Sequence, residues 1–388
     1  MLSYVGSACY AALSRVFGTS ASHRELSKPV KVFLVGATGY IGGSVLTDLL
    51  NTKEDSTLDI TVLTRSPEKA QLFERFGVST VVGSLDDVEK LEAIAEQSDV
   101  VIECADADHI ASTKAFLAGF RKRYEKTGKT PLLIHTSGTA VLNDNAAGMY
   151  GTDTIYYDSD PEQLEAIPPT QPHQAVHKTV VAADKEGYVR TYMILPPTIY
   201  GLASGPLVDA GIIHRRSNQI PALIRASVDR RQAGMVGAGK NFHPNVHIDD
   251  GALPAISRSA WAALTAAACP YTVAQLYRTI LESALSGADI GHGREGYYFA
   301  ENGEHNMLDI AKAMGAALKD MGLAVTVEPS TFTKEELNKY FGGSESLGTN
   351  VRCRAERSRT IGWKPVKTTT DMLASIRPEI EDIRRGGR

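Results

Sequence analysis

A short apolar segment that ends in three regularly spaced glycines constrains the fold of this chain more than any other feature. Residues 31–35 are Lys-Val-Phe-Leu-Val and run directly into Gly-x-x-Gly-x-x-Gly, after which apolar residues recur at helical spacing. A strand, a tight turn and a helix in this order bring bare backbone and the N–H groups of a helix start close to a phosphate. A tight turn without a ligand is the alternative. The residues expected to bind a dinucleotide here are Gly36, Thr38, Gly39, Tyr40, Ile41 and Gly42.

The length and composition of the chain limit the classes of protein to which it can belong. Its 388 residues suffice for a full α/β core and a smaller second lobe. A formal net charge of −4 argues against a general nucleic-acid-binding protein, and no apolar run approaches the roughly 18 residues of a membrane span. The four cysteines form no Cys-x-x-Cys pair, which favours a reducing compartment and indicates no zinc site. We therefore expect a cytoplasmic protein without nucleic-acid or membrane partners.

Residues 1–28 precede the first predicted strand and form an N-terminal extension. The segment is rich in Ser and Ala, contains Arg15 and Arg24, and has no acidic residue before Glu25. These are traits of a transit peptide, although two arginines are few. Mitochondrial import is therefore the alternative to a disordered extension of a cytoplasmic protein.

Further apolar segments predict more strands of the same sheet. They lie at residues 58–63, 78–82, 99–104, 132–135 and 189–195, with a late strand at 297–300. The pattern predicts a doubly wound parallel sheet, in which the residues just beyond each strand's carboxyl end border the cofactor crevice. We therefore expect Ser84 and Leu85 near the adenine, and Ala105 and Asp106 in a loop that passes over the cofactor. Asp106, Asp108 and His109 have no further ligand cluster nearby, so we predict no metal site.

The residue that follows the second strand bears on the choice of cofactor. A dinucleotide fold that prefers NAD usually places an acidic residue there, to bind the ribose hydroxyls. Arg65 stands at this position instead, and its planar guanidinium can pair with a 2′-phosphate. A solvated surface arginine is the alternative. The sequence therefore favours NADP(H) over NAD(H).

Two hydroxyl side chains, Thr136 and Ser137, leave the fifth strand at its carboxyl end. Beside a nicotinamide they can hydrogen-bond a substrate carbonyl or alcohol, and they can equally well cap a turn. Residues 143–172 then form a polar, Pro-containing segment that is long enough for a lid or substrate loop. A helix is predicted at residues 173–187, before the sixth strand.

Taken together, these motifs resemble the extended short-chain dehydrogenase/reductase superfamily in its epimerase/dehydratase-like branch. The resemblance covers about residues 31–365 and is carried by the glycine turn, the Thr136-Ser137 strand end and four later segments. Those segments are Pro196-Pro197-Thr198-Ile199-Tyr200-Gly201, Val246-His247-Ile248-Asp249-Asp250, Asn302-Gly303 and Ile361-Gly362-Trp363-Lys364-Pro365. Within the branch the chain looks most like a group of fungal epimerase-like proteins.

The resemblance implies a Rossmann-type doubly wound parallel sheet with a smaller C-terminal α+β substrate lobe. We assign an NAD(P)-binding Rossmann domain to residues 29–201, a substrate-lobe segment to 202–244, a return to the Rossmann domain to 245–303, and the C-terminal substrate lobe to 304–388. Thr136, Pro196 and Thr198, at strand ends, are assigned to the cofactor site. We expect a small-molecule substrate and allow for a homodimer.

The chain departs from the family at its catalytic residues. The family uses Tyr-x-x-x-Lys on the helix before the sixth strand, where the lysine lowers the pKa of the tyrosine phenol. No tyrosine of this sequence is followed by lysine four positions later. The expected positions fall beside His173, and His177 and Lys178 lie one turn further along. An imidazole titrates near neutral pH and could supply the proton instead, whereas surface histidines at a helix start are the alternative.

The family's catalytic hydroxyl position falls at about Gly138, which leaves Ser137 or Thr139 to replace it. Tyr200 is a further phenol near the cofactor end of the sixth strand, although a tyrosine there more often packs in the turn. The candidate catalytic residues are Ser137, His173, Lys178 and Tyr200.

Two functions follow from these features. The first is an NADP-dependent oxidoreductase that acts on a small carbonyl or alcohol, or that epimerises or dehydrates a sugar nucleotide, with a proton donor other than tyrosine. Arginines of the second lobe could bind an anionic substrate, although such charges are usually solvated; they are Arg215, Arg216, Arg225, Arg230 and Arg231. The alternative is a non-catalytic NAD(P) sensor resembling the nitrogen-metabolite-repression regulators, which the missing Tyr-x-x-x-Lys favours.

Overall fold

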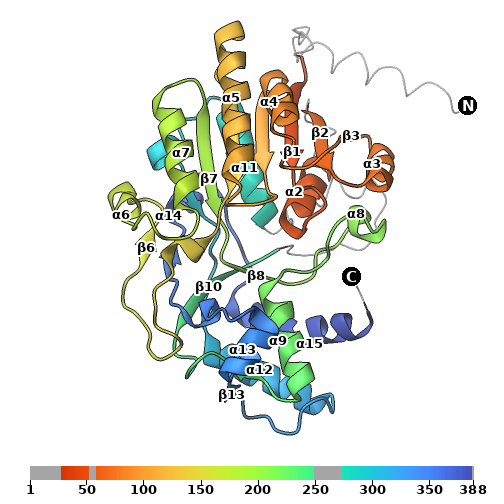
Figure 1. Ribbon diagram of the computed structural model, residues 1–388, viewed down its shortest axis with the longest axis vertical. Coiled ribbons are helices and arrows are strands. Elements are labelled where there is room, and N and C mark those ends of the chain that lie inside the picture. The colour runs from red at the N-terminus through yellow and green to blue at the C-terminus, as the bar shows by residue number, and fades with distance from the viewer. Residues whose placement is uncertain (1–27, 52–57, 249–272, 387–388) are drawn as a thin grey trace, which may run out of the picture.

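A computed structural model of the protein describes residues 28–51, 58–248 and 273–386. Its centre is a seven-stranded sheet in which every neighbouring pair of strands is parallel. The strands, in spatial order, are β11 (Tyr297–Phe299), β7 (Arg190–Leu195), β5 (Leu132–Thr136), β4 (Val100–Glu103), β1 (Val30–Val35), β2 (Leu58–Thr64) and β3 (Ser79–Val82). The next two strands along the chain, β2 and β3, lie on one side of β1, and the strand after them, β4, lies on its other side (Figure 1). In such sheets the ligand crevice lies outside the carboxyl ends of these two strands.

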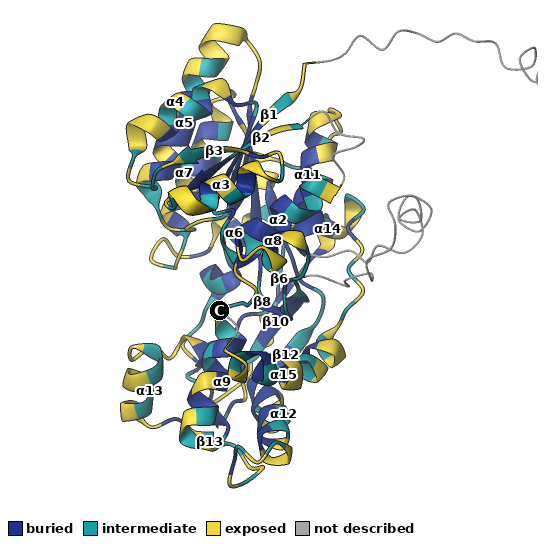
Figure 2. Ribbon diagram, turned by 90° about the vertical axis from the view of Figure 1, so that its right-hand side faces the viewer, coloured by how far each residue is buried: buried dark blue, intermediate teal, exposed yellow. Residues whose placement is uncertain are grey.

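Helices cover both faces of this sheet. The side chains of consecutive strand residues point to opposite faces, and Thr136 contacts Tyr277 of α11 whereas Ser137 contacts His177 of α7. The two helices therefore lie on opposite faces, and the strands between them form the buried layer of Figure 2. The helices of this domain are α2 (Tyr40–Asn51), α3 (Pro67–Glu74), α4 (Val88–Gln97), α5 (Ile110–Thr127), α7 (Gln174–Lys185) and α11 (Val273–Leu285).

A second lobe adjoins the carboxyl-terminal edge of the large sheet through a three-stranded sheet (Figure 1). In this sheet β10 (Phe242–His247) pairs in parallel with β8 (Thr198–Tyr200) and antiparallel with β12 (Glu304–Asn306). A separate apolar cluster forms the core of the lobe. Its helices are α9 (Gln219–Arg230), α12 (Met307–Asp320), α13 (Lys334–Phe341) and α15 (Thr369–Arg384). The shorter elements of the chain are β6 (Tyr156–Tyr157), α6 (Pro161–Glu165), α8 (Pro206–Asp209), β9 (Gly234–Met235), β13 (Ser330–Thr331), β14 (Cys353–Arg354) and α14 (Glu356–Thr360).

The structure confirms the predicted doubly wound parallel sheet, and every strand predicted for it lies within one residue of its observed bounds. Ser66 caps the start of α3, because its hydroxyl accepts a hydrogen bond from the Lys69 N–H at 3.1 Å. Among the described residues, no helix is both long and apolar enough to cross a lipid bilayer. Residues 1–27 of the predicted extension lie outside the described residues. The domain boundaries stay predictions.

The segment 143–172, predicted as an irregular loop, contains two regular elements. These are β6 and the short helix α6. The register pairs Tyr156 of β6 with Cys353 of β14, far away in the sequence. Because the partner strand is so distant, no local pattern in the loop reveals this pairing.

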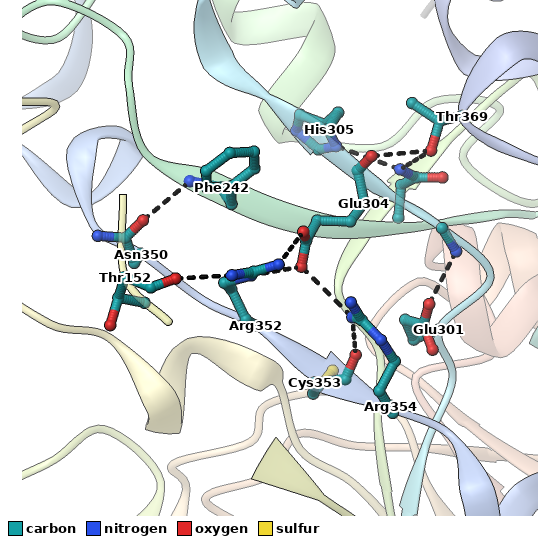
Figure 3. A network of polar contacts seen from close by, with 12 residues as sticks. Thr152, Phe242, Glu301, Glu304, His305, Asn350, Arg352, Cys353, Arg354 and Thr369 are labelled. Carbon is teal, nitrogen blue, oxygen red and sulfur yellow. Dashed lines mark hydrogen bonds and ion pairs between the residues drawn. The ribbon is translucent and has the colours of Figure 1, made fainter. Parts of the chain in front are cut away.

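A polar network ties the C-terminal segment to the three-stranded sheet (Figure 3). Glu304 of β12 accepts hydrogen bonds from Arg352 Nε at 2.9 Å and Nη2 at 2.8 Å, and from Arg354 Nη1 at 3.3 Å. Asn245 of β10 donates to Thr369 Oγ1 at 2.9 Å, at the start of α15. Charge-assisted and bidentate bonds of this kind are stronger than neutral ones. The network therefore holds β10, β12, β14 and α15 in one arrangement.

The C-terminal helix α15 carries two buried acidic residues that contact the turn after β8. Glu379 Oε1 accepts a hydrogen bond from the Gly201 N–H at 3.0 Å, and Asp382 Oδ2 accepts one from Arg216 Nε at 2.7 Å. Glu379 is completely buried. Burial raises the pKa of its carboxyl group to about 7.

Replacing Glu379 by Gln should remove the part of the pH dependence of folding stability that the Glu379 carboxyl group causes. The raised pKa means that the contribution of Glu379 to stability is present below the unfolded-state pKa and is lost as the pH rises through 7. We expect the difference in the free energy of unfolding, Glu379→Gln minus wild type, to increase by on the order of 3 kcal/mol as the pH rises from about 5 to about 8. Urea denaturation measures this difference. Glu381→Gln, on the same helix but half-exposed, is the control, and a difference that stays constant with pH would contradict the expectation.

Candidate functional site

The glycine turn after β1 is packed too tightly for side chains. Gly36 has a φ of +90°, and a Cβ there would lie 2.5 Å from the carbonyl carbon of Cys104 at the end of β4. A Cβ on Gly42 would lie 2.4 Å from the Gly36 carbonyl oxygen. The Gly39 N–H donates to the same carbonyl at 2.9 Å and closes the turn. The start of α2 is therefore held directly outside the carboxyl ends of β1 and β4.

Two adjoining cavities follow this turn and together form the crevice. Their volumes are about 630 Å³ and about 430 Å³, and both are lined by Gly39, Cys104, Ala105 and His214. The smaller cavity extends over the ends of β1, β2 and β3, and the larger one extends toward the second lobe. Burial raises the pKa of the Cys104 thiol to about 12, so this side chain stays protonated at neutral pH.

Most of the residues predicted to bind the cofactor line these two cavities. Those that do are Gly36, Thr38, Gly39, Tyr40, Ile41, Arg65, Ser84, Leu85, Ala105 and Asp106. The hydroxyl of Tyr40 itself is engaged elsewhere, because it donates to the Gly201 carbonyl at 2.7 Å. Tyr40 therefore also connects α2 to the second lobe.

The other predicted cofactor residues are engaged inside the fold. The hydroxyl of Thr136 lies 2.8 Å from the Tyr277 hydroxyl, and that of Thr198 donates to Gln219 Oε1 at 2.7 Å. Pro196 is buried, and its carbonyl accepts a hydrogen bond from the Thr139 N–H at 3.1 Å. Gly42 packs against the turn itself. These four residues therefore shape the crevice and do not line the two cavities.

His173 lies at the start of α7, next to the end of β5. Its backbone is left-handed, with a φ of +69°, which is uncommon for a residue other than glycine. Its Nδ1 lies 2.9 Å from Asp108 Oδ1. Its Nε2 points at Gly138, where a Cβ would lie only 3.2 Å away. The structure thus places an imidazole, held by a carboxylate, beside Gly138, where the sequence predicts the position of the family's catalytic hydroxyl.

Ser137 and His177 form a second pair one helical turn deeper. Ser137 Oγ lies 2.6 Å from His177 Nε2, and both side chains are buried. Burial, and then the neighbouring His135 and His173, lower the pKa of His177 to about 3. His177 is therefore neutral at physiological pH.

The two remaining catalytic candidates lie away from this place. Lys178 is exposed and faces α5, beside Arg121 and Glu186. Tyr200 is completely buried in the core of the second lobe, and its hydroxyl donates to the Thr368 carbonyl at 2.8 Å. Neither side chain reaches the carboxyl end of β5, so neither is placed to move a proton there.

Basic side chains of the second lobe line the larger cavity. His214, Arg216 and Arg225 do so. Arg230 instead pairs with Glu336, its Nε lying 2.7 Å from Oε1. Within the described ranges, no group of three or more His, Cys, Asp or Glu residues is placed to hold a metal ion.

Sequence reasoning missed Asp108 as the partner of His173, and His177 as the partner of Ser137. The spacing of His173 and His177 contained a signal, because residues four apart share one face of a helix. No sequence pattern indicated Asp108 as a partner of His173, because only the fold brings the loop after β4 next to the start of α7.

The fold and the crevice define a dinucleotide-binding protein of the short-chain dehydrogenase/reductase type. The chain belongs to the NAD dependent epimerase/dehydratase family, whose profile matches residues 32–260. It is therefore an enzyme of the NAD(P)-dependent oxidoreductase or epimerase type.

Two fungal proteins illustrate the similarity along most of the chain. Oxidase ucsJ of an Acremonium species is 30% identical over 348 residues, which are 87% of this chain and 93% of that protein. An uncharacterized protein of Schizosaccharomyces pombe is 27% identical, over 89% of this chain and 99% of that protein.

Solved structures share the fold at lower identity. The UDP-glucose 4-epimerase of Thermotoga maritima, solved with UDP-glucose, has a TM-score of 0.57 at 13% identity and covers 92% of this chain and 99% of its own. The dTDP-glucose 4,6-dehydratase of Bacillus anthracis, solved with NAD, has the same TM-score and identity and covers 92% of this chain and 97% of its own. At these identities the similarity shows the fold alone.

Replacing Gly36 by Ala should disturb the turn and the dinucleotide site together. Gly128→Ala is the matched control, because Gly128 also has a positive φ, of +67°, but a Cβ added there would meet no atom within 4 Å. Both variants carry a backbone cost of about 1–2 kcal/mol, and Gly36→Ala adds about 1–3 kcal/mol of overpacking against Cys104. Urea denaturation and calorimetric titration with NADPH measure the two effects. Equal destabilisation of both variants, or full NADPH affinity in Gly36→Ala, would refute this account of the turn.

Proposed function

We propose that the protein is an NADP-dependent oxidoreductase that transfers hydride between the nicotinamide and a carbonyl or alcohol, with His173 as the proton donor. The observation that carries the proposal is the His173–Asp108 pair at the carboxyl end of β5, where the His173 Nδ1 lies 2.9 Å from the carboxylate. Hydride transfer to a carbonyl leaves a negative charge on its oxygen, so a proton donor beside the nicotinamide accelerates the reaction.

The chemistry of the pair fits this role. Asp108 accepts the Nδ1–H of His173, which directs Nε2 toward Gly138. The absence of a side chain at Gly138 leaves room for the imidazole, since a Cβ there would crowd Nε2 at 3.2 Å. An imidazole exchanges protons near neutral pH without an adjacent lysine. His173 therefore replaces the tyrosine that the family uses.

The smaller cavity supports NADP(H) as the cofactor. Arg65 follows β2 and lines this cavity together with Thr64 and Ser84. A guanidinium at this position can form two parallel hydrogen bonds with a 2′-phosphate. The two residues before Arg65, which are Leu63 and Thr64 at the end of β2, carry no carboxylate that could bind the hydroxyls of an unphosphorylated ribose.

The larger cavity supports an anionic substrate. It is lined by His214, Arg216 and Arg225, and Asp382 holds the guanidinium of Arg216 at 2.7 Å. Sugar nucleotides carry a diphosphate that such a cluster can bind, and the similar Thermotoga epimerase was solved with UDP-glucose. A small anionic carbonyl compound is the other substrate that fits these charges. A cytoplasmic location and a homodimer remain predictions of the sequence.

The absence of Tyr-x-x-x-Lys favours one other function, a sensor that binds the dinucleotide without turnover. Incubation with NADPH and a panel of carbonyl compounds and sugar nucleotides separates the two functions. We expect substrate-dependent oxidation of NADPH, followed by absorbance. Tight NADPH binding without oxidation across the panel would support the sensor instead.

Replacing His173 by Gln should lower kcat by roughly 10²–10⁴-fold with little change in NADPH affinity, because a general acid contributes about that factor. Asp108→Asn should cost roughly tenfold, the value of one orienting hydrogen bond. His292→Gln is the matched control, because His292 also lies 2.9 Å from an acid, Asp184, but at the opposite end of α7 from His173. Wild-type turnover by His173→Gln would exclude His173 as the proton donor.

Replacing Arg65 by Ala should weaken NADPH binding by roughly 10–100-fold and leave NADH binding unchanged, because charge-assisted hydrogen bonds contribute about 1.5–3 kcal/mol. Arg75→Ala is the control, since Arg75 is an exposed arginine at the far end of α3. Calorimetric titration with both cofactors measures the change. An equal loss for NADPH and NADH would contradict recognition of the 2′-phosphate.

A further inference from the structure

The segment between β8 and α9, residues 201–218, packs against the helix that follows the dinucleotide turn. Leu207, Ile212 and Ile213 of this segment are buried in the apolar core of the large domain. A Cβ on Gly43 of α2 would lie 2.6 Å from the Ile213 side chain, so the two segments are in close contact. The short helix α8 of the same segment lies beside α2 (Figure 1, Figure 2). The segment is therefore fixed at the start of α2.

Two hydrogen bonds fix the position of His214 in this segment. The His214 N–H donates to the Thr38 carbonyl, inside the glycine turn, at 3.0 Å. Two residues earlier, the Ile212 carbonyl accepts a hydrogen bond from Lys69 Nζ of α3 at 2.6 Å. The side chain of Ile213 is buried in the core, whereas His214 is exposed. The backbone of His214 is therefore held at the turn while its imidazole stays accessible.

His214 lies at the junction of the two cavities. Gly39, Cys104, Ala105 and His214 line both of them, and of these four residues only His214 has a nitrogen atom in its side chain. The smaller cavity covers the ends of β2 and β3, and the larger one extends toward the second lobe. The two halves of a dinucleotide are joined by a diphosphate, which binds at the glycine turn and the helix start. A dinucleotide that fills both cavities therefore passes His214 with its diphosphate.

The glycine turn alone does not balance the charge of a diphosphate. Each phosphate of the link carries a negative charge, whereas a helix start supplies the equivalent of roughly half a positive charge. Residues 36–42 contain no Lys, Arg or His. An imidazole donates a hydrogen bond through a ring N–H whether it is neutral or protonated, and a bond from it to a phosphate oxygen is charge-assisted. The side chain of His214 can therefore supply the donor that the turn lacks.

We infer that His214 binds the diphosphate of the dinucleotide together with the N–H groups of the glycine turn. His214 is thus a cofactor-binding residue from outside the strand–turn–helix unit, and Thr38 and Lys69 position it. Arg216 and Arg225, which line the larger cavity, are left to bind an anionic substrate. The inference rests on the dinucleotide site and not on the proposed hydride and proton transfer.

Calorimetric titration of the whole protein with NADPH and with NADH tests the inference without turnover. His214→Ala should weaken the binding of both by the same factor, roughly 10–100-fold, because both contain the diphosphate. The hydrogen bond to Thr38 is made by the backbone, so His214→Ala keeps it. Arg215→Ala is the matched control, because it removes a positive charge from the adjacent, exposed residue, whose guanidinium faces Asp382 at 3.5 Å. This control should bind both dinucleotides like the wild type.

Phosphorus NMR of bound NADPH tests where the contact lies. The diphosphate and the 2′-phosphate give separate signals. Relative to the wild type, His214→Ala should move the diphosphate signals and leave the 2′-phosphate signal in place. A change of the 2′-phosphate signal alone would contradict the assignment of His214 to the diphosphate.

The other outcomes of the titrations also decide the matter. Wild-type affinity of His214→Ala for both dinucleotides would overturn the inference and leave the imidazole to the substrate. A loss for NADPH alone would assign His214 to the 2′-phosphate, and an equal loss in Arg215→Ala would show a general effect of charge. If the wild type binds neither dinucleotide, the inference fails together with the dinucleotide site. Binding without any oxidation of NADPH would refute the proposed oxidoreductase and leave the inference standing.

Discussion

The contact between the Gly36 turn and the end of β4 is the constraint on which the site depends. A Cβ on Gly36 would lie 2.5 Å from the Cys104 carbonyl carbon, so only bare backbone allows β1, β4 and the start of α2 to meet. Because of this approach, the first turn of α2 opens onto the point where the strand order reverses. The two cavities, and the ten predicted cofactor residues that line them, lie around this one backbone contact.

The second lobe is fixed to this contact by side chains from distant parts of the chain. The hydroxyl of Tyr40, in the first turn of α2, reaches the Gly201 carbonyl, and Glu379 of α15 accepts the N–H of the same glycine. Asp382, one turn further along α15, holds Arg216 at the larger cavity. The C-terminal helix therefore determines where the basic side chains of the second lobe lie relative to the dinucleotide turn.

The proton donor proposed for this protein differs in residue type from the tyrosine of the family that the sequence resembles. His173 caps the start of α7 and His177 lies in its first turn, four positions further along. A histidine pair needs other partners than a tyrosine–lysine pair, because an imidazole has two nitrogens whose protonation must be fixed. Asp108 contacts the outer histidine, while Ser137 contacts the inner one.

The sequence by itself determined the parallel sheet, the dinucleotide turn and the place of Arg65, because buried strands, glycines and strand ends are local patterns. It indicated His173 and Ser137 without showing what either contacts. Only the tertiary structure decided that Asp108 orients His173, that Tyr200 is buried in the second lobe and that Lys178 faces away from the crevice. The physical reason is that these outcomes depend on which segments meet at the carboxyl edge of the sheet, and on helix rotation, neither of which is encoded in residue spacing alone.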